Sequence, residues 1–395
     1  MTRSLRRSMV TAAAMSACCA AVLVALAAHA AGAGVHRAGA PAAPPRLAAA
    51  TARAARTAPA PTMLPGSRRG PVPKLIWGPV TLAGGQSAFP IYHQLGVKVF
   101  QIDLTWSEVA ATRPADPTNP ADPAYQWPAQ VALAISQARQ YGMQICLLVQ
   151  TTPAWANGGR DSTWAPTDPD DYGRFLTAAA REYPSVHLWM IWGEPNRNGD
   201  LEPMPSNSKV GPRRYALLLN SAYHALKGVS TANLVIGGDT WSFGDVEPAS
   251  FVRWMRLPNG KPPPLDYYGH NPFSIRFPDI TAKPYFPGGR DINDIDTLET
   301  ELQSTYHRAV PLWLSEFTVS SGRPNRAFSF AVSRAAQARW VTAAFTLANT
   351  QRYVAGMGWF NLADEPPTSA DGLTNGLMTW DLKPKPAFYA YQRSP

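Results

Sequence analysis

The sequence predicts an α/β fold in which eight strands, each followed by a helix or helix-like segment, close into a (β/α)8 TIM barrel. Eight short apolar runs, rich in strand-forming residues, recur along residues 74–360. Most lack alternation of apolar and polar residues, as expected of parallel strands covered on both faces. The runs are Lys74–Gly78, Val97–Ile102, Met143–Val149, Val186–Trp192, Asn233–Gly237, Leu265–Gly269, Pro311–Leu314 and Val354–Phe360.

Helical patterns fill most of the gaps between these runs. Apolar residues recur at helical spacing in Pro128–Tyr141, Pro212–Val229 and Ala331–Asn349, and Asp168–Glu182 opens with an acidic first turn that suits the helix dipole. The main alternative is an open, doubly wound sheet, which would carry a glycine-rich phosphate loop after its first strand. The residues 84–87 read G-G-Q-S and do not match that loop.

The first seventy residues differ in composition from the rest of the chain. Arginines at positions 3, 6 and 7 precede an apolar stretch that ends in Ala28-His29-Ala30, a pattern typical of a secretory signal peptide. We therefore expect residues 1–30 to be a signal peptide, with an uncleaved membrane anchor as the alternative. Residues 31–70 are rich in Ala, Pro and Arg and predict a disordered linker. Residues 71–395 would then form the barrel domain.

The charge distribution constrains the partners of this domain. The formal net charge is +9, from 36 basic and 27 acidic residues. Residues 1–70 contain nine arginines and no Asp, Glu or Lys, so 27 basic and 27 acidic residues remain in the predicted domain. A neutral domain predicts no nucleic-acid partner, and membrane contact only through an uncleaved N-terminal segment. We expect an exported monomer, either secreted or associated with the cell envelope.

Cysteine usage predicts neither a disulfide nor a zinc site in the domain. Cys18 and Cys19 belong to the predicted signal peptide, which leaves Cys146 within an apolar run. We expect it to be a buried structural thiol. The sequence also contains no recognisable metal cluster, phosphate loop or Ser-His-Asp motif, so we expect no cofactor.

Two glutamates lie where a barrel places its catalytic groups. Glu194 follows the fourth run within W-G-E-P-N, and Glu316 follows the seventh within W-L-S-E-F. Barrel enzymes carry their active sites at the carboxyl ends of the strands. Cleavage of a glycosidic bond requires one carboxylic acid that protonates the leaving oxygen and one carboxylate that attacks or stabilises the anomeric carbon. The two glutamates therefore predict a glycosidase site.

The two motifs resemble those of clan A glycoside hydrolases, with the closest similarity to families 39 and 5. The resemblance covers about residues 74–393 and includes a closing segment at residues 376–378 and 383–391. It implies that Glu194 is the acid/base and Glu316 the nucleophile of a retaining mechanism. It also implies an oligo- or polysaccharide substrate.

Two positions depart from the clan's pattern. The clan commonly has Asn directly before the acid/base, where this chain has Gly193, and an Arg on the second strand, where this chain has Gln101 or Asp103. Hydroxyl contacts that strengthen in the transition state supply several kcal/mol, so their loss could change substrate or lower activity. The alternative is thus a catalytically weakened or inactive carbohydrate-binding barrel at the cell surface. Asn196 is a candidate to replace the missing amide.

Other residues at the predicted strand ends suit a sugar cleft, because sugars stack their apolar faces on aromatic rings while polar groups fix orientation. For any one tryptophan, plain core packing is equally expected. Asp239, Asp364 and Glu365 also follow strands, where helix caps and solvated loops are the ordinary explanation. The predicted binding residues are Trp106, Trp155, Trp192, Trp241, Trp359, Tyr268, His270 and Asn271.

Overall fold

A computed structural model of the chain describes residues 70–324, 328–369 and 372–395. The predicted signal peptide and all of the predicted linker except residue 70 lie outside the described residues. Both therefore stay predictions.

Eight parallel strands form a closed barrel, which confirms the predicted fold. Each strand pairs with its neighbours in sequence order, and the last strand returns to pair with the first. Every predicted apolar run overlaps one barrel strand. The strands are β1 (Lys74–Trp77), β2 (Val99–Thr105), β3 (Gln144–Gln150), β4 (Leu188–Ile191), β5 (Leu234–Trp241), β6 (Tyr267–Asn271), β7 (Leu312–Leu314) and β10 (Val354–Trp359). Of these, β2, β3, β5 and β6 extend past the carboxyl end of their run.

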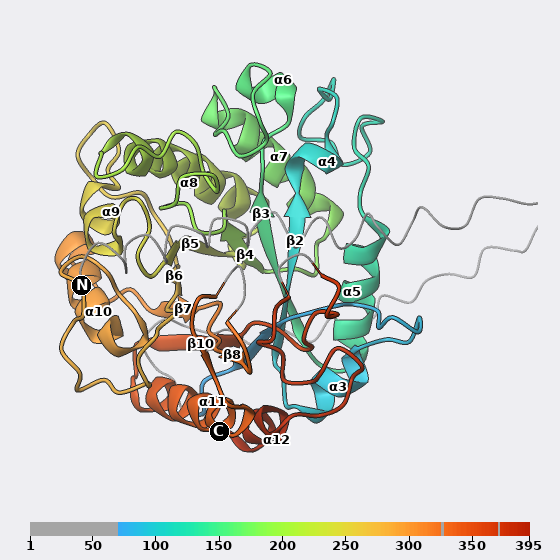
Figure 1. The fold of residues 1–395 in the computed structure, drawn as a ribbon. Coiled ribbons are helices and arrows are strands. Elements are labelled where there is room, and N and C mark those ends of the chain that lie inside the picture. Colours follow the sequence, from blue (N-terminus) through green and yellow to red (C-terminus); the bar gives the residue numbers. More distant parts are fainter. Residues whose placement is uncertain (1–69, 325–327, 370–371) are drawn as a thin grey trace, which may run out of the picture.

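The helices surround the barrel (Figure 1). The four predicted helices are present with small shifts at their ends. The helices are α3 (Phe89–Gln94), α4 (Trp106–Val109), α5 (Ala129–Gln140), α6 (Ala154–Asn157), α7 (Pro169–Glu182), α8 (Val210–Val229), α9 (Pro248–Trp254), α10 (Ile295–Tyr306), α11 (Arg334–Thr350) and α12 (Pro386–Arg393), with one 3-10 turn, η2 (Ile292–Asp294).

One predicted helix begins later than expected. The pattern placed its start at Ala331, but Ala331–Val332 form a short strand, β9, that pairs in parallel with β8 (Ser320–Ser321). The helix α11 starts after Ser333, whose side chain accepts a hydrogen bond from the backbone N–H of Ala336 at 3.2 Å. A serine cap of this kind satisfies one of the free N–H groups of the first turn and fixes the helix start.

The barrel interior changes from apolar to polar toward the carboxyl ends of the strands. Along β2, every second residue belongs to one face, in the order Val99, Gln101, Asp103. The neighbouring residues of β3 on the same face are Cys146 and Leu148, in register with Gln101 and Asp103. Cys146 is fully buried and free, as predicted. The polar end of this interior holds the site described below.

The larger part of the core lies between the barrel and the helices, and tyrosine hydroxyls tie the two layers together. Tyr172 of α7 donates to the carbonyl of Val149 at 2.7 Å, and Tyr215 of α8 donates to the carbonyl of Ile191 at 2.6 Å. Each bond reaches the carboxyl end of a strand. The helices therefore fix the strand ends from which the site is built.

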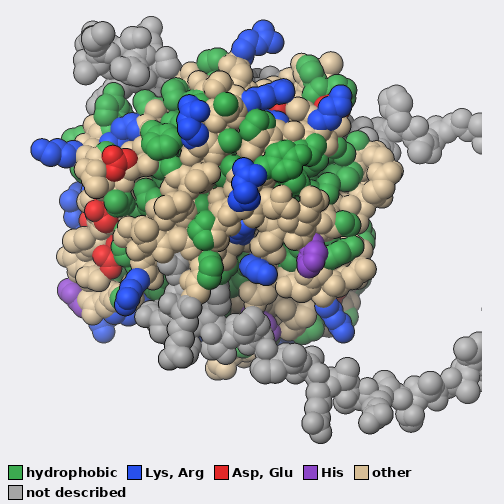
Figure 2. All heavy atoms as spheres, turned by 90° about the horizontal axis from the view of Figure 1, so that it is seen from below, with side chains coloured by type: hydrophobic (Ala, Val, Ile, Leu, Met, Phe, Trp, Pro, Cys, Tyr) green, Lys and Arg blue, Asp and Glu red, His purple; other side chains and the backbone are tan. Residues whose placement is uncertain are grey.

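Hydrogen bonds from the closing segment hold the C-terminal helix against β1. The ammonium group of Lys74 donates to the carbonyls of Tyr391 and Gln392 at 2.8 and 3.1 Å, and the Tyr391 hydroxyl donates to the carbonyl of Leu75 at 3.0 Å. The helices α11 and α12 pack side by side at this edge (Figure 1). The face seen from that side mixes hydrophobic with Lys and Arg side chains and carries few acidic ones (Figure 2). No helix in the described part of the chain combines the length and apolar character of a membrane span.

Candidate active site

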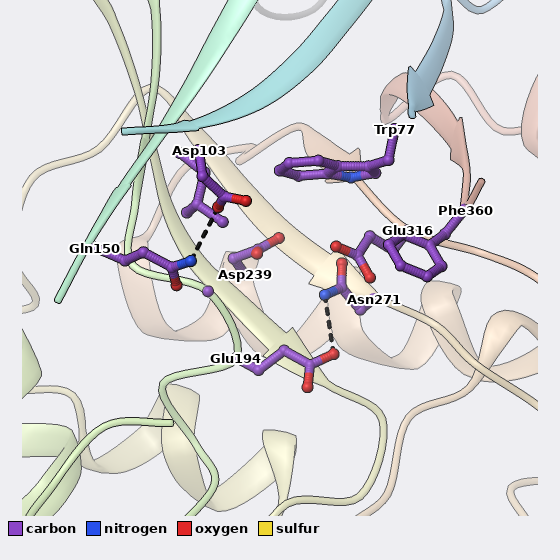
Figure 3. Close-up of a pocket in the computed structure, with 10 residues that line it drawn as sticks. Trp77, Asp103, Gln150, Glu194, Asp239, Asn271, Glu316 and Phe360 are labelled. Atoms are coloured by element: carbon purple, nitrogen blue, oxygen red, sulfur yellow. Dashed lines mark hydrogen bonds between the residues drawn. The ribbon is translucent and has the colours of Figure 1, made fainter. Parts of the chain in front are cut away.

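A single cavity lies at the carboxyl ends of the barrel strands and contains both predicted catalytic glutamates (Figure 3). All eight barrel strands, or the residues that directly follow them, contribute to its wall. Its volume is about 40 Å³. Four of its lining residues carry carboxyl groups. The lining consists of Trp77, Asp103, Leu148, Gln150, Gly193, Glu194, Asp239, Asn271, Glu316 and Phe360.

Glu194 is held by its backbone and by two donors to its carboxyl group. It follows β4 with a left-handed φ of 44°, and its N–H donates to the carbonyl of Asp239 at 3.0 Å. Its Oε1 accepts a hydrogen bond from the Asn271 amide at 3.1 Å, and its Oε2 accepts from the Arg197 guanidinium. The side chain is almost fully buried. A non-glycine residue in this conformation is strained, and such strain is concentrated at functional sites.

Arg197 is a buried cation that sequence inspection did not single out. It also pairs with Asp200 at 3.1 Å, and its guanidinium lies 4.7 Å from the centre of the Trp241 ring. A buried guanidinium is stable only when charges and hydrogen bonds surround it. Because Arg197 lies three positions after Glu194, the loop that follows β4 supplies both members of this ion pair.

Glu316 lies two residues beyond β7, and its carboxyl group points into the cavity beside Phe360 and beneath Trp77 (Figure 3). Among the described residues, none forms a hydrogen bond with this carboxyl group. Burial, together with the carboxyl groups of Glu194 and Asp239, raises the pKa of Glu316 well above its usual range. The uncharged form of the Glu316 carboxyl group is therefore favoured in this arrangement.

Two further carboxyl groups complete the acidic wall. Burial raises the pKa of Asp103 to about 7, against the opposing effect of a 2.9 Å hydrogen bond from Gln150. Burial also raises the pKa of Asp239 to about 8, and the nearby Glu194 carboxyl adds to the shift. Asp239 was only a weak candidate in the sequence, and it lies within β5 rather than after it.

The structure explains both departures from the clan's pattern. A side chain at Gly193 would begin 3.2 Å from Leu148 and 3.3 Å from the Gln150 amide oxygen, so Gln150 already fills the space beside this position. Gln101 donates to the carbonyl of Ser315 at 2.9 Å and accepts from the Trp313 indole at 3.0 Å. Gln101 thus holds the end of β7 through its backbone, next to Glu316, but it brings no positive charge.

Three of the predicted site residues lie in the cavity wall: Glu194, Glu316 and Asn271. Two more, Trp241 and Trp155, are partly exposed but are not part of the wall. Trp241 stacks with Arg197, while Trp155 packs edge-on against Trp106 and donates to the carbonyl of Ala110 at 2.7 Å.

Other predicted aromatic contacts are buried away from the cavity. Trp106 has no exposed surface and stacks on Phe175 at 5.5 Å. Trp359 and Trp192 are also buried, and their indoles donate to the backbone carbonyls of residues 375 and 200. These tryptophans have no face to offer a sugar in this structure, because the aromatic core takes up their rings.

His270 and Tyr268 form a buried polar chain behind the cavity. The His270 Nε2 lies 2.9 Å from the carbonyl of Arg290, so it carries the proton, and Nδ1 accepts from the Thr240 hydroxyl at 2.9 Å. The Tyr268 hydroxyl then donates to Thr240 at 3.2 Å. Burial lowers the pKa of His270 to about 4, so its imidazole is neutral. Both residues hold β5 and β6 together rather than face the cavity.

Three further candidates serve the backbone. Asn196 is fully buried, and its amide bonds to the backbone of Trp241 and Val246, so it has no free group to replace the missing amide of residue 193. Asp364 pairs with Lys385 at 2.8 Å, and Glu365 accepts from the N–H of residue 373. Neither acid lines the cavity, and neither caps a helix or lies in a fully solvated loop: Asp364 forms a buried ion pair, and Glu365 holds the backbone of its own loop.

Four wall residues were not considered as site residues from the sequence: Trp77, Leu148, Gln150 and Phe360. Trp77 is the last residue of β1, and Phe360 directly follows β10. A signal for the two aromatic residues was available, because Phe360 ends its predicted apolar run and Trp77 is the last residue but one of its own. Within residues 70–324, 328–369 and 372–395, no group of three or more His, Cys, Asp or Glu side chains is arranged to hold a metal ion.

Comparison with solved structures shows which known proteins share this fold. A family 39 glycoside hydrolase from Bacteroides cellulosilyticus aligns with a TM-score of 0.59 at 18% identity, over 82% of this chain and 63% of its own length. A monomeric β-xylosidase from Caulobacter crescentus gives 0.58 at 16% over 83% and 69%. A GH5_18 enzyme from Streptomyces cattleya in complex with Manβ1-4GlcNAc gives 0.56 at 15% over 82% and 79%.

These similarities establish that the chain shares the (β/α)8-barrel fold of these glycoside hydrolases. The chain spans less than two thirds of the length of the family 39 enzyme. No sequence-family profile matches the chain, and no curated protein matches it by sequence.

Proposed function

We propose that the chain is a glycoside hydrolase that cleaves O-glycosidic bonds in the cavity at the barrel mouth. The observation that carries this proposal is the convergence of Glu194 and Glu316 in one cavity, from the ends of β4 and β7 in a barrel shared with glycoside hydrolases. Asn271 lies between them in the wall and already bonds to Glu194. The pair supplies both groups that glycosidic cleavage needs.

The mechanism we propose is a double displacement with retention. Ionised Glu316 attacks the anomeric carbon while Glu194 gives its proton to the departing oxygen, which leaves a glycosyl ester on Glu316. Glu194 then takes a proton from water, the resulting oxygen attacks the anomeric carbon, and Glu316 departs as a carboxylate. A productive complex therefore needs a proton on Glu194 and an ionised Glu316, whose pKa is raised by burial in this structure.

The substrate we propose is an uncharged or weakly charged oligo- or polysaccharide. The domain carries 27 basic and 27 acidic residues, so its overall field attracts neither a polyanion nor a polycation. Export rests on the signal-like pattern of residues 1–30 alone. We propose that the enzyme is a secreted or envelope-associated monomer that works without a cofactor.

A weakened or inactive carbohydrate-binding barrel is the second candidate, and three observations favour it. The wall has Gly193 where the clan has an amide, and no arginine of β2 faces Glu316. Ligand pockets usually measure about 300–1,000 Å³, while this cavity measures about 40 Å³.

A panel of activated aryl glycosides of neutral sugars separates the two candidates. The hydrolase predicts turnover by the wild type, and a loss of at least about 1,000-fold in kcat for Glu316→Ala. Glu182→Ala is the matched control, because Glu182 is exposed at the end of α7 and should keep full activity. Sugar binding without turnover on any member of the panel would favour the binding protein.

Glu194→Ala tests the other half of the pair. We expect turnover of poor leaving groups to fall by about 100- to 10,000-fold, because proton donation is lost. Glycosides with very good leaving groups should lose less in the first step, and added azide should restore turnover by attacking the glycosyl ester. An equal loss for all leaving groups, with no azide effect, would contradict an acid/base role for Glu194.

A further inference from the structure

A chain of hydrogen bonds connects Glu194 to a second carboxyl group in the barrel. The Asn271 amide nitrogen donates to Glu194 at 3.1 Å, and the Asn271 amide oxygen accepts from the Ser315 hydroxyl. The same hydroxyl lies 2.6 Å from Oδ1 of Asp239. Three strands contribute, because Asp239 lies in β5, Asn271 ends β6 and Ser315 directly follows β7.

The number of protons in this series of hydrogen bonds determines whether Asp239 is neutral or ionised. The Ser315 hydroxyl has one proton but two close oxygen neighbours. The Asn271 oxygen can only accept, since its nitrogen is turned toward Glu194. The hydroxyl proton therefore goes to Asn271, and the short contact with Asp239 is a hydrogen bond only if Asp239 is the donor. Asp239 is then a neutral acid while Glu194 is ionised.

The surroundings of Asp239 agree with a neutral acid. Its side chain is 1% exposed, and no donor among the described residues reaches its Oδ2. A buried carboxylate with an unpaired oxygen is costly, whereas a neutral carboxylic acid is less so. Burial raises the pKa of Asp239 to about 8. The titratable groups that face it are all acidic: Asp103, Cys146, Glu194, Tyr215, Tyr268 and Glu316.

We propose that Asp239 is the proton partner of Glu194: one of the two carboxyl groups holds a proton while the other is ionised, and the hydrogen bonds through Ser315 and Asn271 couple their states. This inference rests on the proposed role of Glu194 as the acid/base. In the second arrangement of the same protons, protonated Glu194 donates to the Asn271 oxygen, the amide nitrogen donates to Ser315, and Ser315 donates to ionised Asp239. The two arrangements differ by half a turn of the Asn271 amide and by the end that holds the proton.

During turnover, Glu194 and Asp239 therefore have opposite protonation states. When Glu194 is protonated and acts as the acid, Asp239 is ionised and its charge favours the proton on Glu194. When Glu194 has given up its proton, Asp239 takes one from solvent and removes a negative charge next to the new base. When Glu194 regains a proton from water, Asp239 releases one. Over the cycle one proton enters and one leaves, so the balance is kept.

Infrared difference spectroscopy tests the proton directly and needs no turnover. At pH 6.5, wild type minus Asp239→Asn should contain the carbonyl stretch of a protonated carboxylic acid, and Ser315→Ala should move that band. Asp239→Asn keeps the shape and a donor toward Ser315, so it should fold where Asp239→Ala does not. The absence of a protonated-acid band at pH 6.5 would overturn the proposal.

The coupling is tested by titrating that band. In Glu194→Gln the midpoint at which the Asp239 band disappears should move to lower pH, because a neighbouring carboxyl group that disfavours ionisation has been removed. An unchanged midpoint would show that Asp239 is merely a buried structural acid, which also overturns the proposal.

Enzyme kinetics give an independent readout. For Asp239→Asn we expect the alkaline limb of the kcat/KM profile to move to lower pH by about one unit, since ionised Asp239 no longer favours protonated Glu194. Asp266→Asn is the control, because Asp266 directly precedes β6 at the opposite end of the barrel and pairs with Lys227. An identical profile for Asp239→Asn would contradict the coupling. If no glycoside is cleaved, the proposed hydrolase fails, while the infrared result still decides whether the proton is shared.

Discussion

Gln101 lies on β2, where the resemblance to clan A glycoside hydrolases implies an arginine. Its neutral amide makes hydrogen bonds that hold the end of β7 but supplies no charge. Its two hydrogen bonds connect β2 to the backbone and to the indole of β7, one residue before Glu316. Both partners are buried inside the barrel, where water cannot replace a lost bond. An arginine there would also have favoured an ionised Glu316, whereas the neutral amide leaves the pKa of Glu316 high.

Replacing Gln101 by leucine should therefore be costly. The carbonyl of Ser315 and the indole of Trp313 would both be left buried without a partner, at about 1–3 kcal/mol each. We expect Gln101→Leu to lose about 3 kcal/mol of unfolding free energy in urea titrations. Gln140→Leu, at the exposed end of α5, should change the same quantity by less than about 0.5 kcal/mol. Equal unfolding free energies for the two variants would show that the hydrogen bonds of Gln101 do not stabilise the end of β7.

Gly193 and Gln150 should behave as a coupled pair. Gly193→Asn alone must displace Leu148 or Gln150, which lie 3.2 and 3.3 Å from the new Cβ, at a cost of about 1–3 kcal/mol. Adding Gln150→Ala removes one of the two obstructing side chains, so the double variant should regain part of this loss. A double-mutant cycle on unfolding free energies measures the coupling, and strict additivity would show that the two side chains do not compete.

At the scale of elements, hydroxyl groups of the helices set the positions of the catalytic strand ends. Tyr215 of α8 donates to the carbonyl of Ile191 at the end of β4 and accepts from the N–H of Gly238 in β5 at 2.8 Å. These two bonds precede Glu194 and Asp239 by a few residues. The outer layer is therefore part of what aligns the two acids.

Tyr215→Phe should thus weaken both stability and catalysis. It leaves one buried carbonyl and one buried N–H without a partner, so we expect a loss of about 2 kcal/mol in thermal or urea unfolding. We also expect a lower kcat with little change in KM, because the geometry of the acids is altered rather than the binding surface. Tyr223→Phe on the same helix is the control, since that ring is only half-buried. Wild-type kcat in Tyr215→Phe would refute the alignment.

The strands also show how much of the fold and of the site could be predicted from the sequence. All eight barrel strands were predictable, because burial on both faces makes each an apolar run, and β8 and β9 were not, because two residues form no pattern. Both glutamates were predictable from topology, since all strand ends meet at one mouth. The aromatic wall was not, because side chains alternate along a strand: Phe360 lines the cavity while the adjacent Trp359 packs in the outer core.

The whole molecule carries several carboxyl groups whose pKa values folding raises. The pKa values of Asp103 and Asp239, about 7 and about 8, lie above the unfolded value of about 3.9. A raised carboxyl pKa means that the folded state binds protons more tightly than the unfolded chain. The contribution of these raised pKa values to the unfolding free energy is largest below about pH 4. It is lost as the pH rises through about 7 for Asp103 and about 8 for Asp239. His270, with its pKa lowered to about 4, acts only below about pH 6.5.

We therefore expect the unfolding free energy to fall by an amount on the order of 2 kcal/mol between pH 6.5 and 8.5. Thermal unfolding across this range measures the change, and Asp103→Asn should make the dependence on pH flatter. Stability that increases with pH in this window would contradict the raised pKa values.

The proposed retaining mechanism requires that Glu316 form a covalent bond to the sugar. The direct measurement is mass spectrometry of the protein after treatment with an activated 2-deoxy-2-fluoro glycoside of a sugar that it hydrolyses, followed by mapping of the labelled peptide. We predict the mass increase of one glycosyl group, located on Glu316 and absent from Glu316→Ala. A label on another carboxyl group, or turnover with inversion and no label at all, would contradict the account.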